Sequence, residues 1–341
     1  MQAKVFETHK KWKKPSDWTK EGEKMDIFLP ILNQMIILFG FILIGYIVSK
    51  GKFVPDNSPT VLSKLENIIF VPALAMGTFI KNCNVESLRV MWKLLVLSVL
   101  MLAVLIPLSL FLSRLFFKDG YLRRIGSYAM AFSNFGFMGN AIMSAVFPDI
   151  FFEYTVFTLP FWATIYLWGA PVLLIADDGQ KKFSDRLKAF VNPMLIGMLI
   201  GLIIGLTGLK LPKAVTSLIE ISGNCMSPLA MMLTGMTIAK IDLKKLLTKW
   251  KIYGFCAVKL LAYPLLFIAI FALIPQNSFL TATALTCMMN IMCMPMGLNS
   301  IVIPAGYGKD TTDASGMALI SHFFSVGTIP LMYMLFQAVV L

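Results

Sequence analysis

The sequence predicts an all-α polytopic membrane protein with about ten transmembrane helices in two inverted five-helix repeats. Hydrophobic residues make up 57% of its 341 residues, and charged residues only 14%. A soluble domain carries about a quarter charged residues, so this apolar surplus needs lipid as its solvent. At about 20 residues per span plus short loops, the length suits about ten helices in a bilayer. A second observation is the regular spacing of the apolar segments, and a third is a polar interruption that recurs in both halves.

The apolar segments define the predicted helices in order. In the first half they lie at 27–48, 61–80, 91–116, 126–147 and 151–176. In the second half they lie at 193–206, 213–239, 252–274, 279–303 and 312–340. In the sixth segment, Gly197, Gly201 and Gly205 recur at four-residue spacing, which predicts a face that packs closely against another helix.

Polar stretches divide the chain into four parts. We expect a polar N-terminal extension at 1–24, a first repeat at 25–176, a cytoplasmic linker at 177–192 and a second repeat at 193–341. The extension is rich in lysine and lacks the apolar core of a signal peptide. It is therefore expected to be a disordered extension, unless Met25 is the true start.

The net charge of +12 is distributed in short basic clusters between apolar segments. Such clusters are typical of orientation signals and not of nucleic-acid binding, so no nucleic-acid partner is expected. The main clusters are Arg123, Arg124, Lys181, Lys182, Lys244 and Lys245. Their loops predict a multi-pass protein of the plasma membrane with the middle loop in the cytoplasm and both termini outside. The lysines of the extension contradict this orientation, which favours Met25 as the start.

Catalytic and metal-binding patterns are missing from the sequence. The chain has only two histidines, and its five cysteines form no CxxC pair. No Ser–His–Asp, metal-ligand or phosphate-loop arrangement occurs, so we expect no enzyme, no metal site and no cofactor. The cysteines are expected to be reduced packing residues: Cys83, Cys225, Cys256, Cys287 and Cys293.

The two halves share a pattern. Glu66 precedes Pro72 in the second segment, and Glu220 precedes Pro228 in the seventh, each within an Ala/Leu/Met run. Because each half has an odd number of helices, the second half must enter the membrane inverted. This is the inverted-repeat plan of many secondary transporters.

Both halves also carry an interrupted fourth helix. The stretch SNFGFMGNAI holds Asn134 and, five residues later, Gly139; NIMCMPMGLNS holds Asn290 and, five residues later, Pro295. Gly and Pro weaken a helix, and the freed backbone groups are tolerated in lipid only where they line a cavity or meet another helix. The paired breaks predict a substrate site, and close helix packing is the alternative. The predicted binding residues are Asn134, Gly136, Gly139, Asn140, Asn290, Pro295 and Lys259.

At these residues the chain resembles the auxin efflux carrier family, whose bacterial members include organic-acid permeases of the malate and malonate type. The family pattern at the first break is an Asn, a Gly five residues later and a Pro two beyond that. Asn134 and Gly139 match, whereas Ala141 stands where Pro is usual. The stretches ISGNCMSPLAMMLTGMTIA and VKLLAYPLL are also similar, and the match covers 27–341. The resemblance implies a dimeric ten-helix carrier with crossing broken helices, a scaffold part and a moving part.

The expected ligand is a small organic anion. Crossing half-helices place their N-terminal ends near mid-membrane, where their dipoles attract anions, and Asn side chains add uncharged donors. Both asparagines are therefore expected to face one central site. Lys259 lies deep in a helix, so it is expected to pair with a carboxyl group such as Glu220, to bind the substrate, or to extend to the interface.

Three residues are candidates for coupling transport to protons. Glu66 and Glu220 are carboxyl groups in apolar segments, although either would be solvated if it lies at a helix start. His322 would relay protons or serve as a packing residue. Protons or Na⁺ are the expected coupling ions, and a channel or membrane sensor is the alternative to a carrier.

Overall fold

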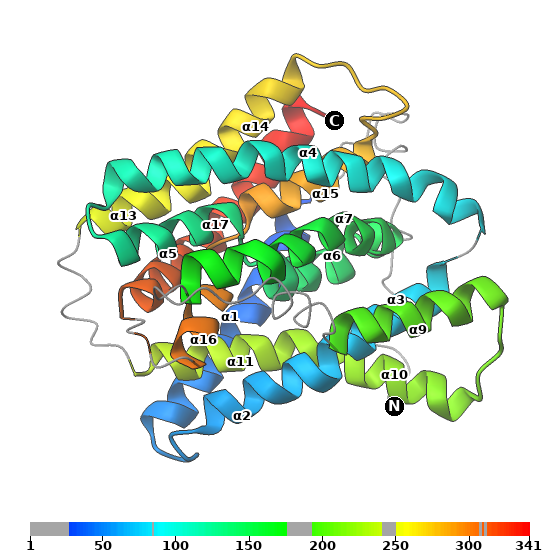
Figure 1. The fold of residues 1–341 in the computed structure, drawn as a ribbon, viewed down its shortest axis with the longest axis horizontal. Coiled ribbons are helices and arrows are strands. Elements are labelled where there is room, and N and C mark those ends of the chain that lie inside the picture. Colours follow the sequence, from blue (N-terminus) through cyan, green and yellow to red (C-terminus); the bar gives the residue numbers. More distant parts are fainter. Residues whose placement is uncertain (1–26, 84, 176–192, 241–249, 307–308, 310–311) are drawn as a thin grey trace.

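The computed structural model describes residues 27–83, 85–175, 193–240, 250–306, 309 and 312–341 (Figure 1). Within these ranges the chain is helical, and its only β-type contact is an isolated bridge. The predicted extension 1–24 and linker 177–192 lie outside the described residues. All five cysteines are free thiols.

The helices of the first half begin with α1 (Phe28–Lys50). A continuous rod follows, formed by α2 (Ser58–Leu65), the π-helical turn η2 (Glu66–Phe70) and α3 (Val71–Asn82). Then come α4 (Val85–Phe116), α5 (Gly120–Ala131), η3 (Phe135–Gly139), α6 (Asn140–Val146), η4 (Pro148–Ile150), α7 (Phe151–Thr164) and η5 (Ile165–Ile175).

The second half repeats this order of long and interrupted helices. It comprises α9 (Pro193–Thr207), α10 (Lys213–Asn224), α11 (Met226–Ile238), α13 (Trp250–Ala257), η6 (Val258–Ala262), α14 (Tyr263–Ala272), α15 (Ala282–Cys293), α16 (Asn299–Gly306) and α17 (Thr312–Val339). Each predicted segment is helical in the structure. Segments 126–147 and 279–303 are interrupted, because α5 stops before η3 and α15 stops before α16.

The helices form two groups. One group contains α1, α2–η2–α3, α9, α10 and α11, which pack mainly on one another along one side of the molecule (Figure 1). Glycines allow this close approach, as predicted: a Cβ at Gly197 would lie 2.6 Å from the carbonyl oxygen of Pro72, and one at Gly205 would lie 2.6 Å from that of Phe79. Small residues are the usual means of bringing helix backbones together in lipid.

The second group holds α4, α5–η3–α6, α7–η5, α13–η6–α14, α15–α16 and α17. The interrupted helices lie inside this group, and α1 and α11 pack against it through α6, η3 and α17. The buried core therefore gathers around the two interruptions.

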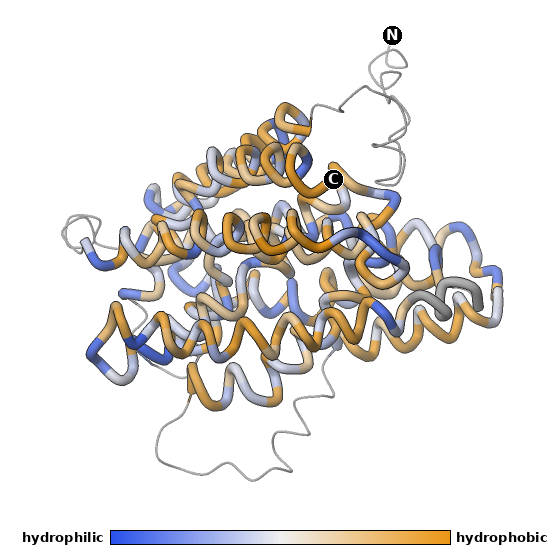
Figure 2. Tube along the Cα trace, turned by 90° about the horizontal axis from the view of Figure 1, so that it is seen from above, coloured by the Kyte–Doolittle hydropathy of each residue, from blue (hydrophilic) through white to orange (hydrophobic). Residues whose placement is uncertain are grey.

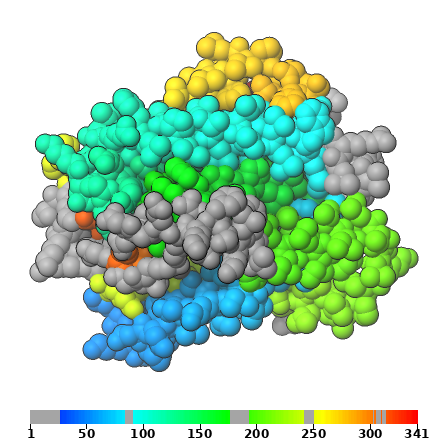
Figure 3. All heavy atoms as spheres, in the orientation of Figure 1, coloured from blue at the N-terminus to red at the C-terminus, as the bar shows by residue number. Residues whose placement is uncertain are grey.

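Apolar residues predominate along most of the helical trace (Figure 2). Large exposed apolar residues occur on α1, α4, α9, α10 and α14, and α4, α9 and α10 lie open on one face of the molecule (Figure 3). Among the described residues, six helices are long and apolar enough to cross a membrane: Phe28–Lys50, Ser58–Asn82, Met91–Phe116, Pro148–Ile175, Trp250–Ala272 and Asp313–Val339. Such surfaces are the expected contact with lipid.

Candidate functional site

The two interrupted helices cross at their breaks and pair through their backbones. Ser133 and Met296 form an isolated antiparallel bridge, and the Asn134 N–H donates to the carbonyl oxygen of Pro295 at 2.8 Å. The Ser133 hydroxyl also donates to the carbonyl oxygen of Ile291 at 2.8 Å. The Asn134 N–H and the carbonyl oxygens of Pro295 and Ile291 are thereby paired between the two helices, and the Met296 N–H donates to the Ser321 hydroxyl of α17 at 3.2 Å.

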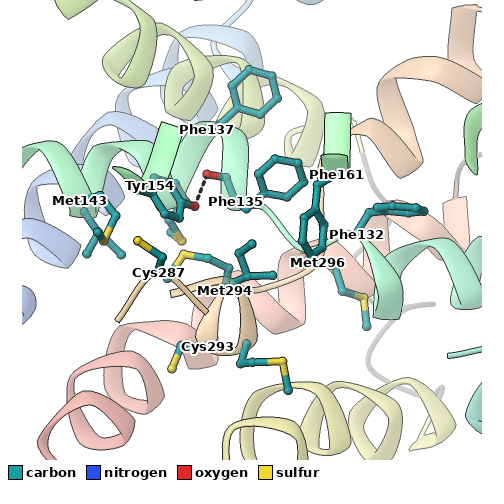
Figure 4. Close-up of a cluster of buried hydrophobic side chains, with 14 of the residues drawn as sticks. Phe132, Phe135, Phe137, Met143, Tyr154, Phe161, Cys287, Cys293, Met294 and Met296 are labelled. Carbon is teal, nitrogen blue, oxygen red and sulfur yellow. Dashed lines mark hydrogen bonds between the residues drawn. The ribbon is translucent and has the colours of Figure 1, made fainter. Parts of the chain in front are cut away.

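Gly297 allows this crossing. A Cβ there would lie 2.6 Å from the carbonyl oxygen of Phe132, so a larger residue would push the two breaks apart. Figure 4 shows Met294 and Met296 of the second break near Phe132 and Phe135 of the first. The Tyr154 hydroxyl donates to the carbonyl oxygen of Phe135 at 2.9 Å and so anchors the start of η3 (Figure 4).

A small cavity lies beside this crossing, and the gaps between its lining atoms and the open solvent at its mouth together measure about 230 Å³. Its wall is largely aromatic. The lining residues are Tyr128, Phe132, Ser133, Asn134, Phe135, Gly136, Phe137, Trp162, Ile165, Gly297, Leu298 and Asn299. The part of this space that a water-sized sphere can enter is about 10 Å³, which is room for about one water molecule, so the side chains nearly close the cavity in this conformation.

Two helix N-termini face the cavity. Phe135 and Gly136 begin η3, whose first hydrogen bond runs from the Gly139 N–H to the carbonyl oxygen of Asn134 at 3.0 Å. Asn299 begins α16. The amides ahead of the first bond of a helix lack intrahelical partners and carry the positive end of the helix dipole. The arrangement therefore favours a negatively charged ligand group.

Asn134 contributes a buried amide side chain to the cavity wall. Its Nδ2 lies 2.9 Å from Nε2 of His322, while its Oδ1 is buried without a hydrogen-bond partner. His322 in turn holds the carbonyl oxygen of Ala318 through Nδ1 at 2.7 Å. The structure thus brings together the predicted binding residue Asn134 and the predicted coupling residue His322.

Asn290 has a different environment from Asn134. It was expected to begin the second break, but α15 continues to Cys293 and the break follows one turn later. Its Oδ1 accepts from the Tyr333 hydroxyl at 2.8 Å, and its Nδ2 donates to the carbonyl oxygen of Gly139 at 3.3 Å. It does not line the cavity and ties α15 to α17 and η3.

Three other predicted binding residues, Gly136, Gly139 and Asn140, lie at or near the first break. A Cβ on Gly136 would overlap the ring of Trp162, and one on Gly139 would overlap the hydroxyl of Tyr154. Asn140 begins α6 and is half-buried, outside the cavity wall. Asn299 and Trp162 were not among the predicted binding residues; Asn299 lies within the NIMCMPMGLNS stretch, whereas no polar residue pattern marks Trp162.

Lys259 is 1% exposed and donates to the carbonyl oxygen of Met130 in the last turn of α5 at 3.4 Å. Its ammonium also lies over the ring of Tyr263, 5.0 Å from the centroid. Glu220 is exposed on α10, so the structure pairs Lys259 with a helix end and not with this carboxyl group. A cation at a helix C-terminus is stabilised by the helix dipole.

Glu66 is fully buried, and neither of its carboxyl oxygens has a hydrogen-bond partner in the structure. It begins the π-helical turn η2, just as Lys259 lies in the π-helical turn η6. Pro72 and Pro264 follow these turns. Since proline removes an N–H and crowds the preceding turn, it explains why the helix widens there.

Comparison with known proteins fits this geometry. The sequence profile of the membrane transport protein family matches residues 30–185 and 181–333, one range in each half of the chain. No curated protein matches the chain significantly. Because the two ranges together span most of the sequence, the chain belongs to the auxin efflux carrier family of membrane transport proteins.

Proposed function

We propose that this membrane transporter is a secondary-active carrier of small organic anions, mono- or dicarboxylates, that works by alternating access. One observation carries the proposal: the N-termini of η3 and α16 face the same small cavity at the crossing of two interrupted helices. Backbone N–H groups and dipoles at helix N-termini bind carboxylates without the cost of burying a second charge. The aromatic wall would cover the apolar part of the ligand.

The architecture supports alternating access by two bodies. We propose ten membrane spans in two inverted repeats, with the group of α1, α2–α3, α9, α10 and α11 as the scaffold. The group that contains the crossing would move against it, because the backbone bridge at Ser133 and Met296 ties both breaks into one unit. Exposed apolar residues on the scaffold, such as Ile68 and Leu218, would face lipid or the second copy of a homodimer.

Proton coupling is favoured over Na⁺ coupling by the position of Lys259. In broken-helix carriers, coupling cations bind at unwound carbonyls and at the C-terminal ends of half-helices. Here the Lys259 ammonium already occupies the C-terminal end of α5, at the carbonyl oxygen of Met130. Glu66 and His322 are the buried groups that would carry a proton, whereas Glu220 is exposed.

The proposal places the protein in the plasma membrane, with both termini outside and with no enzymatic activity. A cation-coupled symporter or antiporter of a related inverted-repeat fold is the alternative, followed by a channel or membrane sensor. Saturable exchange separates a carrier from a channel, since a carrier has a finite number of sites that must reorient in each cycle.

The test begins with thermal stabilisation of the purified protein by malate, malonate and lactate. A stabilising anion would then be followed in proteoliposomes, where a carrier should show saturable exchange between internal and external substrate. Gly136→Ala should weaken binding, because the added methyl group would push the Trp162 ring into the cavity. Gly40→Ala is the matched control, since nothing lies within 4 Å of a Cβ there. Flux that never saturates would indicate a channel, and no stabilisation by any carboxylate would refute the anion site.

A further inference from the structure

The hydrogen bonds of His322 determine the orientation of the Asn134 side-chain amide: Nδ2 faces the His322 ring and Oδ1 faces away from it. Nδ1 of His322 lies 2.7 Å from the carbonyl oxygen of Ala318, and a carbonyl oxygen can only accept a hydrogen bond. Nδ1 must therefore carry the proton of the neutral ring, which leaves Nε2 as an acceptor. The Asn134 Nδ2, 2.9 Å from Nε2, must be the donor.

The other end of the amide is left unsatisfied. Asn134 is 2% exposed and lines the cavity, and its Oδ1 has no hydrogen-bond partner. A buried acceptor without a partner costs free energy until a ligand donates to it. We infer that His322 is a positioning residue. In its neutral form it makes Asn134 offer its amide oxygen, an acceptor, to the ligand, and in its protonated form it makes Asn134 offer its NH₂ group, a donor, instead.

In the neutral state, Asn134 offers an acceptor. The site then favours an anion that carries a hydroxyl or N–H donor beside its carboxylate, because that donor satisfies Oδ1 while the helix N-termini hold the carboxylate. A bare carboxylate would place its oxygens against the Asn134 oxygen. This refines the proposed function and rests on it.

In the protonated state, Nε2 of His322 becomes a donor and pairs with Oδ1 of Asn134. The amide turns over about its last side-chain bond, and Nδ2 is presented to the ligand instead. The two orientations have nearly the same shape, so the reversal needs no movement of the backbone. A single proton thereby converts the side chain from an acceptor of ligand hydroxyls into a donor to ligand oxygens.

Other groups near α17 also titrate, so the readout must isolate His322. The buried titratable side chains on the helices packed against α17 are Tyr128, Cys256, Lys259, Tyr263, Cys287 and Cys293. Their ionisation would change the affinity for any anion in the same direction. A ratio of affinities for two anions of equal charge cancels that shared effect.

Lactate and pyruvate are suitable probes, because both are three-carbon monoanions and they differ in a hydroxyl or a ketone beside the carboxylate. Binding would be measured by calorimetry with the full-length protein in lipid nanodiscs. At about pH 8, lactate should bind roughly tenfold more tightly than pyruvate, and the ratio should fall toward one only as the buried ring of His322 gains a proton. His322→Phe should make the ratio independent of pH. Pyruvate binding as tightly as lactate at the higher pH, or a pH-dependent ratio that persists in His322→Phe, would overturn the inference.

A second measurement does not depend on the ligand or on the folding of a variant. The chain has only two histidines, His9 and His322, so ¹⁵N-histidine NMR of the unmodified protein gives a simple spectrum. The buried ring should show a protonated Nδ1 and a bare Nε2 at about pH 8. The opposite tautomer would overturn the inference. If neither probe binds while this tautomer is observed, the carboxylate proposal fails, whereas the fixed orientation of Asn134 is supported.

Discussion

Replacing Asn290 with Leu should destabilise the protein far more than the same change at Asn134. Asn290 is fully buried and has two partners, the Tyr333 hydroxyl at 2.8 Å and the carbonyl oxygen of Gly139 at 3.3 Å. Leu would leave both partners unpaired, at about 1–3 kcal/mol each, so the free energy of unfolding should fall by roughly 2–6 kcal/mol. Because the bond to Gly139 is long, the lower half of this range is expected.

Asn134→Leu has a smaller expected effect on stability. It leaves only Nε2 of His322 without its partner, and it removes the unpartnered Oδ1 at the same time. The net change in the free energy of unfolding should be within about 1–2 kcal/mol. Binding of the anion should nevertheless be lost, since Asn134 lines the cavity.

A double-mutant cycle isolates the Asn290–Tyr333 bond. Tyr333→Phe removes the hydroxyl and keeps the ring, which stacks on Phe147 with centroids 5.5 Å apart. Each single variant leaves one member of the Asn290–Tyr333 bond unpaired, whereas in the double variant both members of that bond are gone. The double variant should therefore lose less than the sum of the single losses, by about 1–2 kcal/mol. Additive losses in thermal or denaturant unfolding, or an Asn290→Leu variant as stable as Asn134→Leu, would refute this reasoning.

Three further predictions follow from other parts of the molecule. Because the Lys259 side chain occupies the C-terminal end of α5, where a coupling cation would bind, replacing external Na⁺ with an organic cation should leave anion uptake unchanged, and Na⁺-dependent accumulation would contradict this. Gly235→Ala would press a Cβ into the backbone of α1, so thermal unfolding should show a loss of about 1–3 kcal/mol, whereas Gly40→Ala should show none. A cysteine placed at Lys181 should react with impermeant reagents only from the cytoplasm, and labelling of intact cells would reverse the proposed orientation.

The positions of the helices were predictable because apolar segments of about 20 residues can hardly form anything else in lipid. The packing face of Gly197 and Gly205 was also predictable, since four-residue spacing places both glycines on one side of a helix. The register of the second break was not. The sequence pairs Asn290 with Asn134 by residue type, whereas the structure pairs Met296 with Ser133 through backbone groups that every residue carries.

The sequence also could not predict which of the two glutamates, Glu66 or Glu220, is buried. Glu66 and Glu220 occupy matching positions before Pro72 and Pro228, yet Glu66 is fully buried and Glu220 is exposed. Which side of a rod faces another helix depends on the packing partner and not on the local pattern. The free Oδ1 of Asn134 depends in the same way on His322, which lies 188 positions away in the chain.

Because Ser133 and Met296 pair through their backbones, each half of the chain alone would have unpaired backbone groups at its interrupted helix. A fragment ending near residue 176 would contain one interrupted helix whose exposed N–H and C=O groups have no counterpart. In hydrocarbon such groups cost several kcal/mol each, so the fragment would have to find a complementary chain or remain misassembled. When the two halves are co-expressed as separate polypeptides, they should therefore reassemble, because each supplies a backbone hydrogen-bond partner that the other lacks.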